Sequence, residues 1–213
     1  MKYKCVIFDC DGVLVDSEAI SCKVLLEMAK DLGLNLNWDD TIEEFSGKSL
    51  GSIVEYIEAR IEGKVPSNFE TEFRKKTFEA FKQDLKPIAG VSDLVNALNV
   101  PFCVASSGPR EKIKLNLTLI NLINKFSEHQ IFSSYDIGCW KPDPGIYLHA
   151  ANKMGYKPED CAVIEDSIYG VEASISGGFD TFAYTRGPKK ETFVKMGATT
   201  FSNMKSLERL LKV

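Results

Sequence analysis

The sequence predicts an α/β fold in which an all-helical block interrupts one parallel sheet. Short apolar segments typical of buried strands alternate with helical segments, starting at Cys5–Phe8 and resuming after Pro87. Strands that alternate with helices form βαβ units, and such units build a parallel sheet. No convincing strand occurs between Asp16 and Lys86, so the helices there are predicted to be an insertion after the first strand.

The composition indicates an ordinary globular protein. A chain of 213 residues suggests one large domain, or one domain that carries an insertion. The hydrophobic fraction of 44% and the charged fraction of 26% are usual for a soluble protein. The net charge of −4, without a basic block, argues against a nucleic-acid partner, which would require clustered Lys and Arg.

The N-terminal segment carries no recognisable secretory signal, and no stretch approaches the roughly 18 apolar residues of a membrane span. We therefore expect a cytoplasmic protein without a membrane partner. The six cysteines include no C-x-x-C pair, which favours reduced, structural thiols. Only two histidines occur, and neither a zinc-ligand spacing nor a G-x-S-x-G segment is present. This argues against a zinc site and a Ser-His-Asp hydrolase.

The first strand leads directly into acidic residues. Cys5–Phe8 is continuously apolar, as in a strand buried on both faces, and it ends in Asp9-Cys10-Asp11-Gly12. The block that follows is predicted to start at Ser17, a suitable N-cap, with Glu18 in the first turn. Its four predicted helices cover about residues 17–30, 39–45, 49–61 and 67–81.

After Pro87 the alternation of helices and strands returns. The predicted helices cover residues 91–98, 110–120, 144–154, 168–176 and 204–211. The predicted strands cover residues 102–105, 130–132, 161–164, 180–184 and 199–201.

Three of the predicted strands end in polar side chains, and parallel strands bring those ends to one edge of the sheet. The residues are Asp9, Asp11, Ser106, Glu165 and Asp166, and the loop that carries Lys141 is a candidate to join them. Four carboxylates in a small space repel one another, and a single lysine does not balance them. A hard divalent cation with oxygen ligands would, and Mg²⁺ suits such a site best.

Four segments form a recognisable set: Asp9-x-Asp11-Gly12-Val13-x-x-Asp16-Ser17-Glu18, Ser106, Lys141-Pro142-x-Pro144-x-x-Tyr147 and Glu165-Asp166-Ser167-x-x-Gly170-x-x-Ala173. With these segments the chain resembles the haloacid-dehalogenase-like hydrolase superfamily. The branch is the one whose helical cap follows the first strand, which includes β-phosphoglucomutase and many sugar phosphatases. The resemblance covers nearly the whole chain. The stretch Ser134–Ile137 before Trp140 looks most like the 6-phosphogluconate and hexose-phosphate phosphatases of this group.

The resemblance implies a Rossmann-like core made of residues 1–15 and 87–213 and a four-helix cap made of residues 16–86. It implies a Mg²⁺-dependent phosphatase that acts on a small phosphorylated metabolite through phosphorylated Asp9. Asp11 would transfer protons, and its backbone carbonyl would be a metal ligand. Asp9, Asp166 and Glu165 would complete the metal site, with Glu165 in direct or indirect contact. Ser106 and Lys141 would hold the phosphoryl oxygens.

Further residues are candidates for substrate binding. Lys48 occupies the place where relatives put a basic residue that faces the active site, and Glu18 could face a sugar hydroxyl or simply stabilise its helix. Ser107, Gly108 and Arg110 follow Ser106 and could reach the phosphate or the leaving group. We expect a monomer.

Other interpretations remain open. Each motif alone has a simpler explanation, such as a solvated loop for Asp9 and Asp11 or a helix cap for Glu165 and Asp166. A sugar-phosphate mutase is disfavoured because Ser21 stands where β-phosphoglucomutases carry a His. A phospho-acceptor signalling module is disfavoured because such modules are shorter and lack the helical insertion. A dehalogenase is disfavoured because those relatives lack the second acid, here Asp11.

Overall fold

A computed structural model of the chain describes residues 2–38, 41, 45 and 50–212. The chain divides into two compact units, one formed by Met1–Asp16 with Lys86–Val213 and the other by Ser17–Leu85. We call them the sheet unit and the helical unit.

The sheet unit is built on six parallel strands in the order β3-β2-β1-β4-β5-β6. The strands are β1 (Cys5–Phe8), β2 (Phe102–Ser106), β3 (Ile131–Ser133), β4 (Cys161–Glu165), β5 (Asp180–Tyr184) and β6 (Thr199–Phe201). All four residues of β1 are fully buried, because strands on both sides and helices on both faces cover it. The predicted α/β fold with a parallel sheet is confirmed.

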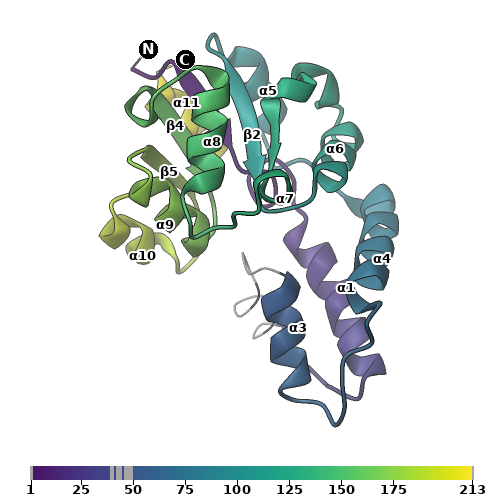
Figure 1. Cartoon of the computed structure of the whole chain (residues 1–213). Coiled ribbons are helices and arrows are strands. Elements are labelled where there is room, and N and C mark those ends of the chain that lie inside the picture. Colours follow the sequence, from purple (N-terminus) through teal and green to yellow (C-terminus); the bar gives the residue numbers. More distant parts are fainter. Residues whose placement is uncertain (1, 39–40, 42–44, 46–49, 213) are drawn as a thin grey trace. The chain divides into compact units, whose positions relative to one another are not determined.

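Helices cover both faces of this sheet (Figure 1). They are α5 (Val91–Ala97), α6 (Arg110–Leu119), α7 (Ser134–Ile137), α8 (Gly145–Met154), α9 (Ile168–Ser176), α10 (Lys190–Met196) and α11 (Met204–Leu211). Short 3-10 turns occupy Ile123–Lys125, Glu128–Gln130 and Pro158–Asp160. Ile146 and Tyr147 of α8 pack on the sheet face that presents Cys5, Ile7 and Cys103. This packing anchors the segment that precedes α8 beside β1.

The helical unit contains α1 (Glu18–Asp31), α3 (Leu50–Glu58) and α4 (Phe69–Asp84), and α1 packs against α4. Its core includes Leu25, Met28, Ile57 and Phe69. The predicted helix over residues 39–45 falls largely outside the described residues, so the predicted count of four helices stays a prediction.

The element bounds agree with the sequence pattern to within one or two residues in most of the sheet unit, and α9, β5, β6 and α11 match it fully. Two helices, α7 and α10, have no counterpart among the predicted elements. The reason is that each is short and buries a single residue, Ser134 in α7 and Phe193 in α10, which is too little for a periodic pattern.

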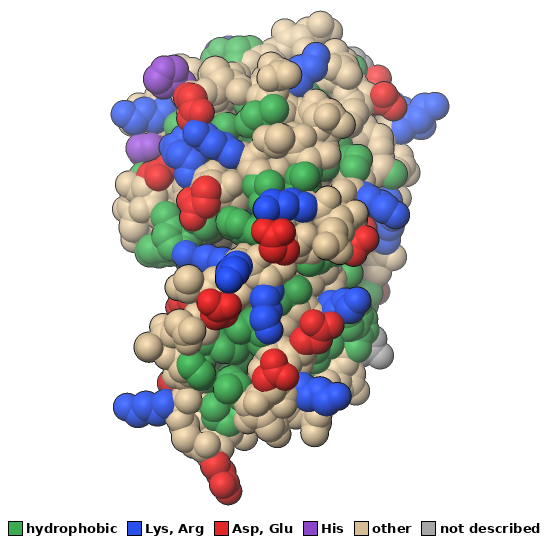
Figure 2. Space-filling view, turned by 90° about the vertical axis from the view of Figure 1, so that its right-hand side faces the viewer, with side chains coloured by type: hydrophobic (Ala, Val, Ile, Leu, Met, Phe, Trp, Pro, Cys, Tyr) green, Lys and Arg blue, Asp and Glu red, His purple; other side chains and the backbone are tan. Residues whose placement is uncertain are grey.

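The charged surface agrees with the balanced composition. On the face drawn in Figure 2, Lys and Arg side chains are interspersed with Asp and Glu and do not form a patch of one sign. Within the described part of the chain, no helix is both long and apolar enough to cross a membrane.

Packing of α8 on the sheet gives a first prediction. Ile146 is fully buried, whereas Leu148 on the same helix is 39% exposed. We expect Ile146→Ala to lower the free energy of unfolding by about 2–5 kcal/mol, because it leaves a cavity in the core. Leu148→Ala should change it by less than about 0.5 kcal/mol. Urea unfolding of both variants measures this, and equal losses would contradict the assigned packing.

Candidate active site

The ends of β1 and β4 bring two acidic residues to one edge of the sheet. Phe8 pairs with Ile164, and the Asp9 backbone N–H donates to the Ile164 carbonyl at 2.9 Å. Asp9 therefore follows β1 at the level where β4 reaches Glu165. Because the strand order reverses at β1, this edge is where open parallel sheets form their ligand sites.

Lys141 lies between these two carboxylates. Its ammonium Nζ is 2.6 Å from Asp9 Oδ1 and 2.6 Å from Glu165 Oε1. All three side chains are nearly removed from solvent, with Lys141 only 5% exposed. Although burial opposes its charge, the two carboxylates raise the pKa of Lys141 well above its ordinary value. The lysine is therefore a permanent cation at the centre of the site.

Glu165 is fixed by donors on both of its oxygens. Oε2 accepts from the backbone N–H groups of Asp166 and Ser167 at 2.7 and 2.8 Å, and from the Ser167 hydroxyl at 3.0 Å. Oε1 accepts from Lys141 and from the Tyr147 hydroxyl at 2.8 Å. Burial opposes ionisation, but Lys141 and these hydrogen bonds lower the pKa of Glu165. Glu165 is thus a fixed anion that holds Lys141.

A glycine makes room for this carboxylate. A Cβ atom on Gly170, in the first turn of α9, would lie 1.8 Å from Glu165 Oε1. Ser167 caps the same helix by accepting from the Gly170 N–H at 3.0 Å. The spacing of Glu165, Ser167 and Gly170 in the sequence therefore allows the Glu165 carboxylate to lie against the first turn of α9.

Asp9 is a buried carboxyl group with two acidic neighbours. Burial raises its pKa from 3.8 to about 7; Lys141 acts in the opposite direction, and the charges of Glu165 and Asp11 add to the rise. The site in this form has one anion too many, so an additional cation would stabilise ionised Asp9.

Asp11 points toward α6. The Lys112 ammonium is 2.8 Å from Asp11 Oδ2, and the Asn116 amide nitrogen is 3.3 Å from Asp11 Oδ1. Neither residue belongs to the motifs predicted from the sequence. Their spacing of four, which places both on one face of a helix, is the signal that could have drawn attention to them.

Ser106 ends β2 at the same edge and is 1% exposed. Its hydroxyl accepts from the Gly108 N–H at 3.1 Å, and the Ser133 hydroxyl donates to the Gly108 carbonyl at 2.7 Å. Ser107 lies between them and is half-buried. The loop predicted to meet the phosphate is therefore tied to β3 through Ser133, which belongs to none of the predicted motifs.

Two carboxylates near the end of β1 are candidate ligands of a magnesium ion. Gly12 adopts a φ of +76°, and a Cβ atom on it would lie 2.0 Å from Asp166 Oδ2, so the Asp166 carboxylate rests against the loop that follows Asp9. Within the described residues, no group of three or more His, Cys, Asp or Glu side chains is arranged to hold a metal. The candidate oxygen ligands are instead the carboxylates of Asp9 and Asp166 and backbone carbonyls. Magnesium is commonly held by one or two carboxylates, with water and phosphate completing its shell.

Three predicted substrate residues remain, and only Arg110 belongs to the sheet unit. Arg110 Nε donates to Asp136 Oδ2 at 3.1 Å, and its Nη1 donates to the Glu128 carbonyl at 3.3 Å, so its guanidinium is engaged within the sheet unit. Glu18 is the first residue of α1 in the helical unit. Lys48 lies outside the described residues.

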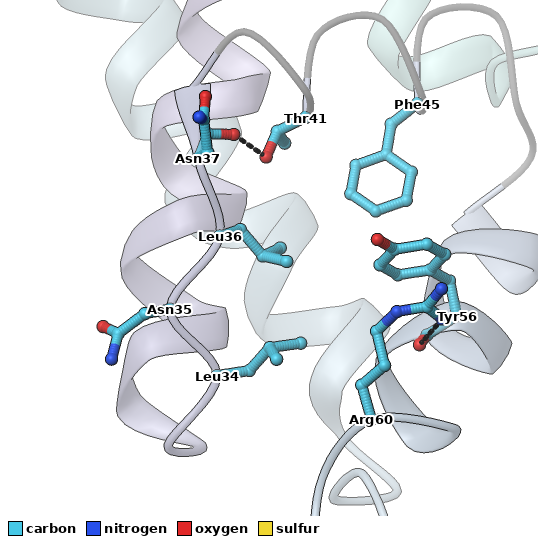
Figure 3. A pocket seen from close by; sticks show the side chains of 8 residues that line it. All are labelled: Leu34, Asn35, Leu36, Asn37, Thr41, Phe45, Tyr56 and Arg60. Atoms are coloured by element: carbon cyan, nitrogen blue, oxygen red, sulfur yellow. Dashed lines mark hydrogen bonds between the residues drawn. The ribbon is translucent and has the colours of Figure 1, made fainter.

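A separate cavity of about 300 Å³ lies within the helical unit (Figure 3). Its lining residues are Leu34, Asn35, Leu36, Asn37, Thr41, Phe45, Tyr56 and Arg60. The Arg60 guanidinium stacks 3.4 Å from the centre of the Tyr56 ring and donates to the Tyr56 carbonyl. None of the predicted catalytic residues lines this cavity, so it is not the site at the sheet edge.

Comparison with known proteins identifies the family. The family model described as haloacid dehalogenase-like hydrolase matches residues 6–184. The chain belongs to the haloacid dehalogenase-like hydrolases. It is 32% identical over 213 residues to a 6-phosphogluconate phosphatase of Escherichia coli K12, covering 99% of this chain and 96% of that protein.

Solved structures of the family agree with the fold. A conserved haloacid dehalogenase-like protein of unknown function from Agrobacterium tumefaciens superposes with a TM-score of 0.85 at 28% identity, covering 99% of this chain and 98% of the other. A haloacid dehalogenase family hydrolase from Deinococcus radiodurans, crystallised with phosphate and sodium, gives a TM-score of 0.80 at 27% identity, with coverage of 99% and 95%. These comparisons confirm the predicted family and the predicted enzyme class, a phosphatase.

The contact between Gly170 and Glu165 gives a second prediction. Alanine normally favours a helix over glycine by about 1 kcal/mol. Here we expect Gly170→Ala to destabilise the protein by about 1–3 kcal/mol, because the methyl group displaces Glu165 and with it Lys141. Gly187→Ala is the control, since a Cβ atom there has no neighbour within 4 Å. Thermal unfolding compares them, and a stabilised Gly170→Ala would refute the contact.

The raised pKa of Asp9 gives a third prediction. Between pH 3.8 and about 7 the folded protein binds a proton at Asp9 that the unfolded chain releases, so stability from this group falls as the pH rises through that window. Asparagine does not titrate. In EDTA we therefore expect Asp9→Asn to be more stable than the wild type at pH 8, by on the order of 2 kcal/mol.

The advantage of Asp9→Asn should vanish near pH 3, where Asp9 is protonated in the folded protein and largely protonated in the unfolded chain. Urea unfolding at both pH values measures it. An Asp9→Asn variant that is no more stable than the wild type at pH 8 would show that Lys141 compensates Asp9 fully.

Proposed function

We propose that this protein is a magnesium-dependent phosphatase that hydrolyses a sugar phosphate or sugar-acid phosphate, such as 6-phosphogluconate, through phosphorylated Asp9. The observation that carries the proposal is the position of Lys141, 2.6 Å from both Asp9 and Glu165 at the sheet edge. A surface lysine or a structural ion pair would not need two buried carboxylates, one of them with a pKa raised to about 7.

The reaction begins with attack on phosphorus. An oxygen of ionised Asp9 forms a bond to phosphorus while the bond to the leaving oxygen breaks, and Asp11 gives its proton to that oxygen. Lys141, held by Glu165 next to Asp9, and the Ser106 hydroxyl hold the phosphoryl oxygens. The sugar leaves as a neutral alcohol, and Asp9 carries the phosphoryl group.

The second half of the reaction reverses these roles. Asp11 takes a proton from water, the water oxygen bonds to phosphorus, and the bond to Asp9 breaks to release inorganic phosphate. Asp9, Asp166 and the Asp11 carbonyl would hold the magnesium ion, with Glu165 acting indirectly through Lys141. When bound, the ion supplies positive charge that offsets Asp9 and polarises the phosphate.

The substrate class rests on the relatives. The 6-phosphogluconate phosphatase matches the chain over 96% of its own length, so the similarity extends to both units. A phosphate ion accompanies the Deinococcus radiodurans structure. We propose a monomeric enzyme of the cytoplasm that acts on a small metabolite, with Lys48 and Glu18 of the helical unit as candidates for substrate selection.

This function gives a fourth prediction. With Mg²⁺, the pure protein should release phosphate from p-nitrophenyl phosphate and from members of a panel of sugar phosphates, sugar-acid phosphates and nucleotides. EDTA should abolish release, and added Mg²⁺ should restore it. Asp9→Asn should fold but lose about 10⁴-fold or more of the turnover, because it removes the nucleophile.

The matched control is Asp180→Asn, an acid that pairs with Lys2 at the start of β5, opposite the strand ends that form the site, and it should keep nearly full turnover. Phosphate release by pure Asp9→Asn protein at wild-type rates would refute the covalent role. Faster interconversion of sugar phosphates than release of phosphate would favour the mutase interpretation. Phosphorylated Asp9 that persists without turnover would favour a signalling module.

A further inference from the structure

We infer that Lys112 and Asn116 are positioning residues that hold the Asp11 carboxylate for proton transfer, an inference that rests on the proposed function. The contacts are specific. Lys112 Nζ is 2.8 Å from Asp11 Oδ2, and Asn116 Nδ2 is 3.3 Å from Asp11 Oδ1. Each carboxylate oxygen thus has its own donor, and the two donors together restrict both the position and the rotation of the carboxylate.

Both donors come from one rigid element. Lys112 and Asn116 are four residues apart in α6, so their side chains lie one above the other on the same helix face. A helix whose Ile113 and Leu117 are buried in the core cannot shift freely. The contacts also lie entirely within the sheet unit, and they therefore do not depend on the placement of the helical unit.

The burial of Asn116 favours a role beyond structure. Its side chain is fully buried, and its amide oxygen has no hydrogen-bond partner among the described residues. A buried polar group that is only half satisfied destabilises a fold, and an apolar side chain would serve better at this position for packing alone. Only the amide nitrogen of Asn116 forms hydrogen bonds, and it donates them to Asp11 and to the Cys10 sulfur.

The same helix is linked to the loop predicted to meet the phosphate. A Cβ atom on Gly108 would lie 3.4 Å from the Lys112 Cδ atom and 3.5 Å from the Ser106 hydroxyl oxygen. The stem of Lys112 therefore runs along the segment that follows Ser106. A longer side chain at position 108 would push Lys112 away from Asp11.

The chemistry of the leaving group separates positioning from a merely structural role. A sugar alkoxide is strongly basic and needs the proton of Asp11 as its bond to phosphorus breaks. The p-nitrophenolate group is weakly basic and leaves without that proton. Misplacement of Asp11 therefore slows hydrolysis of an alkyl phosphate selectively, whereas a general distortion of the site slows both substrates alike.

The test compares kcat/KM for 6-phosphogluconate, or for glucose 6-phosphate if the wild type prefers it, with kcat/KM for p-nitrophenyl phosphate. This quantity reports the steps up to formation of phosphorylated Asp9. For Lys112→Met and Asn116→Leu we expect a loss on the sugar substrate that exceeds the loss on p-nitrophenyl phosphate by about 10- to 100-fold. Lys112→Arg, which keeps a charged donor, should recover a large part of it.

Lys114→Met is the matched control. Lys114 lies on the same helix but pairs with Glu128 at 2.6 Å, so this variant should retain the wild-type ratio between the two substrates. Circular dichroism and thermal unfolding verify that the variants fold. If Lys112→Met does not fold, Lys112→Gln, which keeps a donor without the charge, is measured in its place.

Equal losses on both substrates, or no recovery with Lys112→Arg, would overturn the positioning role while leaving the phosphatase function intact. Absence of hydrolysis of any phosphate monoester by the wild type would instead refute the proposed function itself. The two failures are therefore distinguishable in one set of measurements.

Discussion

The interaction on which the rest of the site depends is the bridge that Lys141 forms between Asp9 and Glu165. A single buried ammonium lies 2.6 Å from two carboxylates that strand pairing forces together. Removal of either partner from such a buried arrangement leaves an uncompensated charge, which is why these arrangements are strongly coupled. Lys141 and hydrogen bonds keep the pKa of Glu165 low. For Asp9, burial outweighs the effect of Lys141, and the charges of Glu165 and Asp11 add to the rise of its pKa. A site of this kind gains from a further cation, and the Asp166 carboxylate lies against the loop where one would be held.

Two glycines of the motifs are needed for this arrangement because they leave room for acidic side chains, not because they carry a functional group. Gly12 leaves room for the Asp166 carboxylate, and Gly170 leaves room for Glu165. Neither glycine contributes a functional group. Each permits an acidic side chain to approach a backbone more closely than any Cβ atom would allow. The acidic residue and its glycine are therefore one structural unit, and the spacing between them in the chain is fixed by the turn into α9 or by the loop after β1.

The sequence predicts the sheet, its acidic edge and the family because these follow from local patterns: apolar strands that end in Asp9, Ser106 and Glu165. It does not reveal which partner each charged side chain selects. Arg110 follows the predicted phosphate loop, yet it pairs with Asp136, which is distant in the chain and becomes its neighbour only through α7. Lys112 resembles any exposed helical lysine in the sequence, and only the fold brings it to Asp11. Tyr147 belonged to a recognised motif, but its hydroxyl contact with Glu165 depends on how α8 packs.

The position of α6 connects two parts of the proposed reaction. Ser106 ends β2, Gly108 follows it, and α6 begins at Arg110, so the hydroxyl proposed to hold the phosphate and the donors to Asp11 belong to one continuous segment. Ser133 of β3 ties this segment to the sheet through the Gly108 carbonyl. A displacement of α6 would therefore move Ser106 and the Asp11 carboxylate in concert. The reaction requires a defined distance between the phosphoryl group and the group that gives its proton to the leaving oxygen. A single segment that carries Ser106 and the donors to Asp11 can maintain that distance.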